Sequence, residues 1–272
     1  KYKNKIILPC KDISIYERSD INQPYEILES QIIEPNDKVD VHFDKTKSLV
    51  LPIALLDIEG LRRLSTYRIE LIFDKRTLKL ELQYVNRFHY LPISTKNDIN
   101  TVKVVSQHLL SMAIGKPIIA TQKKKGGPKL IIHIHVDALP QSIIDKYGMG
   151  IMPNTKKFFA KRGICFSNAY AQADWTLPSV ASVFTGTYTN EHLLYHPKNK
   201  YDIEHKTLAD TLQENGYKTF ACTSVARINP QTSFDKGFDR FVIAPFKNED
   251  YIINEALEQL NTFQGKQYIF LA

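Results

Sequence analysis

The sequence contains little cysteine and no long apolar run, and each scarcity excludes a class of protein. Its 272 residues include three cysteines, Cys10, Cys165 and Cys222, which are odd in number and widely spaced. They fit neither a disulfide framework nor a zinc cluster. No apolar run approaches the roughly 18 residues of a membrane-spanning helix. We therefore expect no membrane span in this chain.

The basic excess is modest and local. Lys and Arg number 36 against 29 Asp and Glu, a net charge of +7, and the excess gathers at residues 123–125 and 156–162. No Arg-rich arm, zinc knuckle or aromatic RNA-binding signature accompanies it. The charge therefore favours solubility, or attraction to an anionic substrate, and we expect no nucleic-acid partner. The sequence does not indicate a compartment.

The first part of the chain has the texture of β-strands. Residues 49–56 form a continuous apolar run, and residues 67–73 and 78–85 alternate apolar and polar side chains around a short polar connection. This pattern predicts a buried strand and a hairpin. Helical spacing occurs only at residues 101–113. We predict a smaller β-rich domain over residues 1–125.

A charged, glycine-containing stretch separates this part from the rest. Residues 122–128 read QKKKGGP, which indicates a linker or surface loop. Beyond it, predicted strands at 129–136, 217–223 and 267–271 alternate with predicted helices at 154–162, 178–184, 207–216 and 249–263. Strands separated by helices indicate an α/β domain, with a mostly parallel sheet and helices on both faces, over residues 126–272.

Three details of this second part are also predicted. Thr207 should cap its helix, and the helix at 249–263 should turn Ile252, Ile253, Ala256, Leu257 and Leu260 inward. The chain ends in an apolar strand, so we expect the domain to be truncated at its C-terminal end. The open edge of that last strand should then expose apolar surface.

Chemistry-bearing side chains follow the first strand of the second part. Asp137 comes directly after it, where a carboxylate is a natural ligand for a divalent cation, although a turn aspartate is the simpler alternative. His133 and His135 share its face by period-two alternation. They form either a zinc site or a pair of hydrogen-bonded strand histidines.

Thr176 precedes a predicted helix whose first turn suits Pro178. Free backbone N–H groups and the positive end of the helix dipole would face an anion there. A hydroxyl beside a cation at such a place can act as a nucleophile. The plainer alternative is a threonine that caps an ordinary helix.

Five segments, in order, resemble the sulfatase-like part of the alkaline phosphatase superfamily. They are the strand through Asp137, residues 152–170 (similar to TPNLDRLAAEGVRFTNAY), residues 176–188 (similar to C-x-P-S-R…LTGRYP), residues 207–219 (similar to LAELLKEAGYRT) and residues 236–241 (similar to GFD-x-F). The resemblance covers about half of the chain. It implies that Thr176 is the catalytic nucleophile and that Asp137 and Thr176 are metal ligands.

The resemblance is broken at functional positions. Sulfatases carry cysteine or serine, converted to formylglycine, at the position of Thr176, and threonine cannot form that aldehyde. Val180 stands in place of their signature arginine, and Ala138 in place of their second aspartate. Their lysine and histidine after the GYRT strand have no counterpart in residues 222–227. Threonine nucleophiles occur instead in relatives that act on phosphoesters.

These observations predict a metal-dependent hydrolase or transferase. It would act on a phosphate ester, or less readily a sulfate ester, through a covalent Thr176 intermediate. The resemblance implies a divalent metal ion (Zn, Mn or Ca) as cofactor and an anionic ester, such as a glycan or cell-envelope component, as partner. The alternative is a non-catalytic, sulfatase-like binding or scaffolding protein. The remaining metal ligands are expected beyond Ala272, so this chain alone should be inactive and bind metal weakly.

Overall fold

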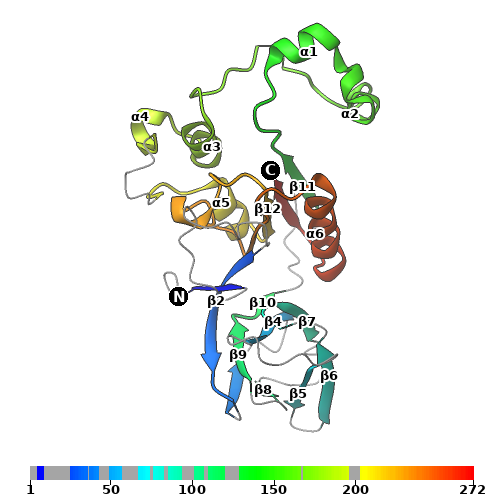
Figure 1. Cartoon of the computed structure of the whole chain (residues 1–272), viewed down its shortest axis with the longest axis vertical. Helices are drawn as coiled ribbons and strands as arrows, with labels where there is room; N and C mark the ends of the chain where they lie inside the picture. Colours follow the sequence, from blue (N-terminus) through cyan, green and yellow to red (C-terminus); the bar gives the residue numbers. More distant parts are fainter. Residues whose placement is uncertain are drawn as a thin grey trace.

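The computed structural model describes twelve stretches of the chain (Figure 1): residues 5–8, 25–35, 37–42, 49–56, 67–73, 76–82, 85–93, 101–106, 110–119, 129–166, 168–195 and 203–272. The predicted linker at 122–128 lies outside them. None of the described helices is long and apolar enough to cross a bilayer.

The first part is built from β-strands, as predicted. Its described strands are β1 (Lys5–Leu8), β2 (Tyr25–Ile33), β3 (Lys38–His42), β4 (Leu49–Leu56), β5 (Tyr67–Phe73), β6 (Arg76–Leu82), β7 (His89–Ile93), β8 (Thr101–Ser106), β9 (Ser111–Gly115) and β10 (Ile118–Ile119). The order β3-β8-β5-β6 forms an antiparallel sheet. Its Ile69 and Leu71 pack against Ile53 and Leu55 of β4, so the core lies between two layers of strands.

The second part is α/β, as predicted. Its main elements are β11 (Leu130–Ile134), α1 (Gln141–Tyr147), α2 (Pro153–Phe159), α3 (Thr176–Thr185), α4 (Thr189–His192), α5 (Leu208–Glu214), β12 (Lys218–Thr223), β13 (Arg240–Ile243), α6 (Glu249–Thr262) and β14 (Gln267–Leu271). The strands β13-β12-β14-β11 are parallel neighbours. Side chains of α3 and α5 pack on one face of this sheet and those of α6 on the other.

Strand β2 joins the two parts into one sheet. Ile27 pairs with Phe241 of β13, and further along the same strand Ile32 pairs with Ala113 of β9, both antiparallel. Ten of the described strands therefore form one continuous sheet, whose order runs from β10 to β11. The parallel strands are thus bordered, next to β13, by β2, an antiparallel strand that comes from the first 33 residues.

A buried ionic network fastens the same junction. The guanidinium of Arg240 donates to Glu26 of β2 at 2.7 Å and to Glu255 of α6 at 3.0 Å. The hydroxyl of Tyr90, from β7, also donates to Glu26, and the Arg240 guanidinium lies over the Tyr90 ring. Burial raises the pKa of the Glu26 carboxyl, and the positive charge of Arg240 opposes that shift. Strands from the first part and α6 are thus held on one buried cation.

Helix α5 begins at the residue that the sequence predicts. Thr207 is its N-cap, and the Thr207 hydroxyl and Asp210 carboxylate form a reciprocal capping box. Gly237 packs so closely on this helix start that a Cβ atom there would lie 2.3 Å from the Asp210 nitrogen. Only glycine allows that approach.

Three expectations are wrong. Within the range 101–113, where we predicted a helix, the described residues 101–106 form β8 and 111–113 begin β9, because these segments pair with neighbouring strands. In α6, Ile253 and Leu257 are exposed, whereas Glu255 and Gln259 turn inward to meet Arg240. The last strand, β14, is not an open edge, since it lies between β12 and β11.

Among the described parallel strands, β11 is paired on one side only, with β14. Its Ile132 and Ile134 are 48% and 65% exposed. Helices α1 and α2, which follow β11, contain no buried residue, and Figure 1 shows them standing away from the sheet. The described helices therefore cover the central parallel strands, whereas the apolar side chains of β11 remain exposed.

Candidate functional site

Thr176 and Asp137 meet at the carboxyl end of the parallel strands. Asp137 follows β11 by three residues, and Thr176 is the first residue of α3. The Thr176 hydroxyl lies 3.2 Å from each carboxylate oxygen of Asp137 and donates to them. Because the carboxyl ends of parallel strands are where open α/β sheets bind ligands, this pair is the centre of the candidate site.

The start of α3 leaves backbone donors available. Its N-cap is Trp175, not Thr176 as the capping alternative would require, and no side chain caps the helix. The N–H groups of Thr176 and Leu177 lie in the first turn and have no acceptor within the helix, and Pro178, the third residue, has no N–H. The Thr176 hydroxyl therefore stands beside free backbone donors and the positive end of the helix dipole. The helix ends at Thr185, and its C-cap residue Gly186 adopts a left-handed φ of 69°.

The two strand histidines differ in their surroundings. The Nδ1 atom of His133 lies 3.5 Å from the Tyr268 hydroxyl, and its ring meets the Phe270 ring edge-on. Burial and the neighbouring His135 lower the pKa of His133. The Nε2 atom of His135 is shielded from solvent, has no hydrogen-bond partner among the described residues, and lies 3.6 Å from Asp137 Oδ1.

A cation contacts the ring of Trp175, the residue that precedes the nucleophile candidate. Arg227, in the loop after β12, places its guanidinium 5.3 Å from the ring centroid of Trp175, the only tryptophan in the sequence. Arg227 is exposed and forms no ion pair with a carboxylate among the described residues. The aromatic ring orients the guanidinium through a cation–π contact. Its guanidinium N–H groups remain available to an anion.

A second hydroxyl–imidazole pair lies on the buried side of α3 and does not have the arrangement of a nucleophile and its base. Ser182 Oγ and His192 Nε2 are 2.9 Å apart. The Leu194 backbone N–H donates to His192 Nδ1, so Nε2 carries the proton and donates to the serine. A general base would need an unprotonated nitrogen facing the hydroxyl. The pair therefore fastens α4 to α3.

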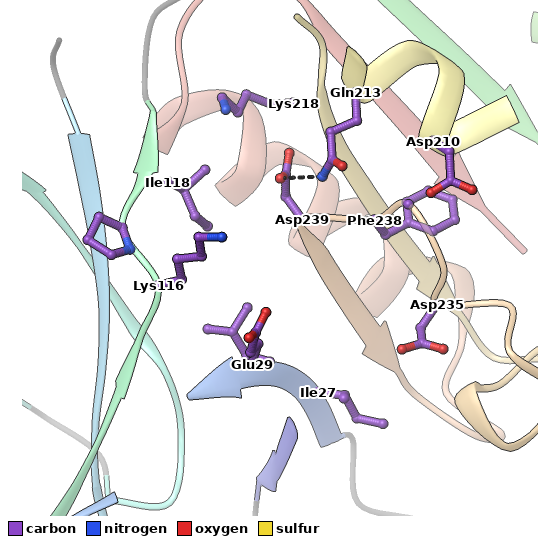
Figure 2. Close-up of a pocket in the computed structure, with 13 residues that line it drawn as sticks. Ile27, Glu29, Lys116, Ile118, Asp210, Gln213, Lys218, Asp235, Phe238 and Asp239 are labelled. Atoms are coloured by element: carbon purple, nitrogen blue, oxygen red, sulfur yellow. Dashed lines mark hydrogen bonds between the residues drawn. The ribbon is translucent and has the colours of Figure 1, made fainter. Parts of the chain in front are cut away.

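A cavity of about 440 Å³ lies elsewhere, between the two parts of the chain. Figure 2 shows Lys116 and Glu29 on one side of it and Gln213 and Asp239 on the other, with the Gln213 amide donating to Asp239 at 2.7 Å. It opens at the amino ends of β12 and β13, where Lys218 begins β12. The cavity is thus at the opposite end of the sheet from Thr176 and forms no part of the candidate site.

Comparison with known proteins identifies the fold. Residues 129–268 match the family model described as Sulfatase, which is just over half of the chain. The chain belongs to the sulfatase family. No curated protein matches it.

Several solved structures are similar to this sulfatase-family chain, and one of them covers about half of it. It is described as BT4656 in complex with its substrate D-glucosamine-2-N,6-O-disulfate. The two share 21% identity with a TM-score of 0.44, over 52% of this chain and 33% of the other. The chain thus spans about a third of the length of that protein.

Two positions depart from the sulfatase pattern in a way that the geometry explains. Val180, in place of the signature arginine, is 1% exposed and packs in the core beneath α3, so it offers no polar group to the site. Ala138, in place of the second aspartate, has a left-handed φ of 55°. Asp and Asn tolerate that conformation better than Ala. The backbone turn at position 138 therefore suits an aspartate, although the residue there is alanine.

The donors present fit a divalent metal ion in part. Members of the sulfatase family generally use such an ion. The Asp137 carboxylate and the Thr176 hydroxyl, 3.2 Å apart, supply hard oxygen donors that could bind the same ion. In the stretches that the structure describes, no three His, Cys, Asp or Glu side chains form a metal-binding group. These residues would hold one side of an ion and leave further positions to other ligands.

Sequence reasoning reached Asp137 and Thr176 but missed what surrounds them. The Arg227–Trp175 contact joins residues far apart in the sequence, and no local pattern announces it. The period-two alternation of β11 placed His135 on the face of Asp137, but only the structure distinguishes its buried, unpartnered nitrogen from the paired His133.

Proposed function

We propose that this sulfatase-family chain carries the nucleophile of a metal-dependent hydrolase or transferase that acts on phosphate esters. The observation that supports this most is the Thr176 hydroxyl, 3.2 Å from both oxygens of Asp137 at the uncapped start of α3. A carboxylate in that position accepts the hydroxyl proton, or orients the oxygen for attack.

The residues divide the reaction among them. Arg227 binds the non-bridging oxygens of the ester, and the free N–H groups of α3 stabilise the charge that grows on them. The Thr176 hydroxyl passes its proton to Asp137 and its oxygen attacks phosphorus in line, the bond from phosphorus to the leaving oxygen breaks, and the leaving oxygen takes up a proton from water. A bound divalent ion would lower the cost of forming the Thr176 alkoxide. Water or an acceptor alcohol then attacks the phosphothreonine and restores the hydroxyl.

The residue type favours phosphorus over sulfur. A formylglycine nucleophile releases sulfate by re-forming its aldehyde, whereas Thr176 has one hydroxyl and no such route. Its adduct needs a second in-line attack, which is established chemistry for phosphoesters. The substrate is an anionic ester, and a glycan or cell-envelope component suits the family.

The ester preference is directly measurable. We expect the full-length protein, supplied with zinc, manganese or calcium, to hydrolyse an aryl phosphate monoester or phosphodiester faster than the matching aryl sulfate. The comparison uses the same leaving group and reads kcat/KM for each ester. Faster turnover of the aryl sulfate would contradict the proposal.

Substituting Arg227 tests the anion-binding step. Arg227→Ala should raise KM for the phosphoester about tenfold or more and change kcat less, because the guanidinium binds charge present in both substrate and transition state. Arg68→Ala, which removes an exposed arginine on β5, is the matched control and should leave both constants unchanged. An unchanged KM in Arg227→Ala would remove Arg227 from the site.

A non-catalytic role is the second candidate. Ala138 and the buried Val180 remove two polar groups that sulfatases use, and a chain that kept the fold while losing its site would look the same. The two candidates differ in metal content. Full-length protein that is purified without stoichiometric divalent metal, and regains none, favours a scaffold.

A further inference from the structure

His135 offers a nitrogen that nothing in the described structure uses. Its Nε2 atom is buried without a hydrogen-bond partner among the described residues and lies 3.6 Å from Asp137 Oδ1. The same Oδ1 atom accepts from the Thr176 hydroxyl at 3.2 Å. A buried polar atom left unpaired is unfavourable, and a ligand that engages it removes that cost.

The imidazole is held in place by its surroundings. The His135 backbone N–H donates to the carbonyl of Leu271 at 2.8 Å, which extends the pairing of β11 with β14 by one residue. The His135 ring stacks near the Phe270 ring, with centroids 6.4 Å apart and an angle of 27°. Since backbone and ring are both fixed, Nε2 faces the Asp137 carboxylate before any ligand arrives.

We propose that His135 Nε2 is a third ligand of the ion held by Asp137 and Thr176, and that it makes this a site for zinc or a similar transition metal rather than calcium. The inference rests on the proposed function. It extends the proposed function by adding His135 to the metal ligands. The second aspartate of the sulfatase pattern would stand directly after Asp137, where this chain has Ala138.

The spacing and the donor chemistry both support this set. Nitrogen and oxygen ligands stand about 2.0–2.2 Å from zinc, so two donors of one ion lie about 3.0–3.6 Å apart. The measured separations, 3.6 Å from His135 to Asp137 and 3.2 Å from Thr176 to Asp137, fall within that span. Calcium takes oxygen ligands, whereas imidazole suits zinc and its neighbours.

His133 provides a matched control on the same strand and face. Its Nδ1 atom already lies near the Tyr268 hydroxyl, and its ring packs edge-on against Phe270. It is therefore a structural residue in this arrangement. A zinc site made of His133 and His135 together is the competing arrangement.

The test measures metal binding without substrate. The whole chain is titrated with Zn²⁺ by calorimetry and with Co²⁺ by visible absorption, alongside Ca²⁺. We expect Zn²⁺ to bind more tightly than Ca²⁺. His135→Ala and Asp137→Ala should each weaken Zn²⁺ and Co²⁺ binding about tenfold or more, and His133→Ala less than about twofold. His135→Asp should shift the preference toward Ca²⁺, which serves as a second variant if the alanine is poorly folded.

Each contrary result has a distinct meaning. Zn²⁺ binding by His135→Ala equal to that of the unaltered chain overturns the inference, as does equal loss in His133→Ala, which would indicate the histidine pair. Tighter Ca²⁺ than Zn²⁺ binding also overturns it. The proposed function fails separately, if the Thr176→Ala protein is fully active. Weakened Zn²⁺ binding by His135→Ala together with an active Thr176→Ala protein would therefore support His135 as a metal ligand and reject Thr176 as the nucleophile.

Discussion

Replacing Thr176 by alanine should reduce turnover of a phosphoester at least about 10³-fold, because the variant has no oxygen with which to form the covalent intermediate. Thr176→Ser should retain part of the activity, since the hydroxyl survives and only the methyl group is lost. The measurement is kcat/KM of the full-length protein with an aryl phosphoester and added divalent metal.

A threonine at the other end of the same helix controls for this substitution. Thr185 is the last residue of α3, and its hydroxyl donates to the Ala181 carbonyl at 2.8 Å within the helix. Thr185→Ala should keep the activity of the unaltered protein within about threefold. An active Thr176→Ala protein would disprove the nucleophile assignment, and robust arylsulfatase activity in the unaltered protein would disprove the preference for phosphorus.

Replacing Arg240 by methionine should lower the free energy of unfolding by about 3–5 kcal/mol, because it leaves two buried carboxylates without their cation. Arg240 is 2% exposed and donates to both Glu26 and Glu255. Adding Glu26→Gln and Glu255→Gln to the same protein should recover part of the loss, since the stranded charges are then gone. Chemical denaturation measures each variant.

The exposed pair between Arg68 and Glu81 is the matched control. Their side chains lie 3.0 Å apart on neighbouring strands, and both are more than half exposed. Exposed pairs contribute at most about 1 kcal/mol, so Arg68→Ala should have a small effect. If Arg240→Met were as mild as Arg68→Ala, the buried network would not be what secures the junction.

The sequence predicts those features that depend on neighbouring residues, and it fails for those that depend on contacts between distant elements. The N-cap Thr207 of α5 and the apolar strand β14 are each determined by neighbouring residues, so both are predicted correctly. The valines of β8 have helical spacing but become a strand because β3 and β5 pair with them. The inward turn of Glu255 depends on Arg240, which lies on another element and is invisible to the periodicity of α6.

The candidate site divides in the same way. Asp137 and Thr176 could be named because each follows a recognisable local feature, a strand end and a helix start. Their mutual distance could not be derived from those features, because α1 and α2 lie between them in the sequence. The Trp175–Arg227 contact needs the loop after β12 to reach the start of α3, and only the assembled sheet brings the two together.

The position of β2 in the sheet also has a consequence for synthesis on the ribosome. Arg240 reaches Glu26 across 214 residues of sequence, so the earliest described part of the junction emerges long before its partner. Strand pairing over such a separation is slow, because the loop must close before any contact forms. Until β13 appears, one edge of β2 is open to other chains. A nascent chain of this kind would benefit from a chaperone that shields residues 25–33 until translation passes β13.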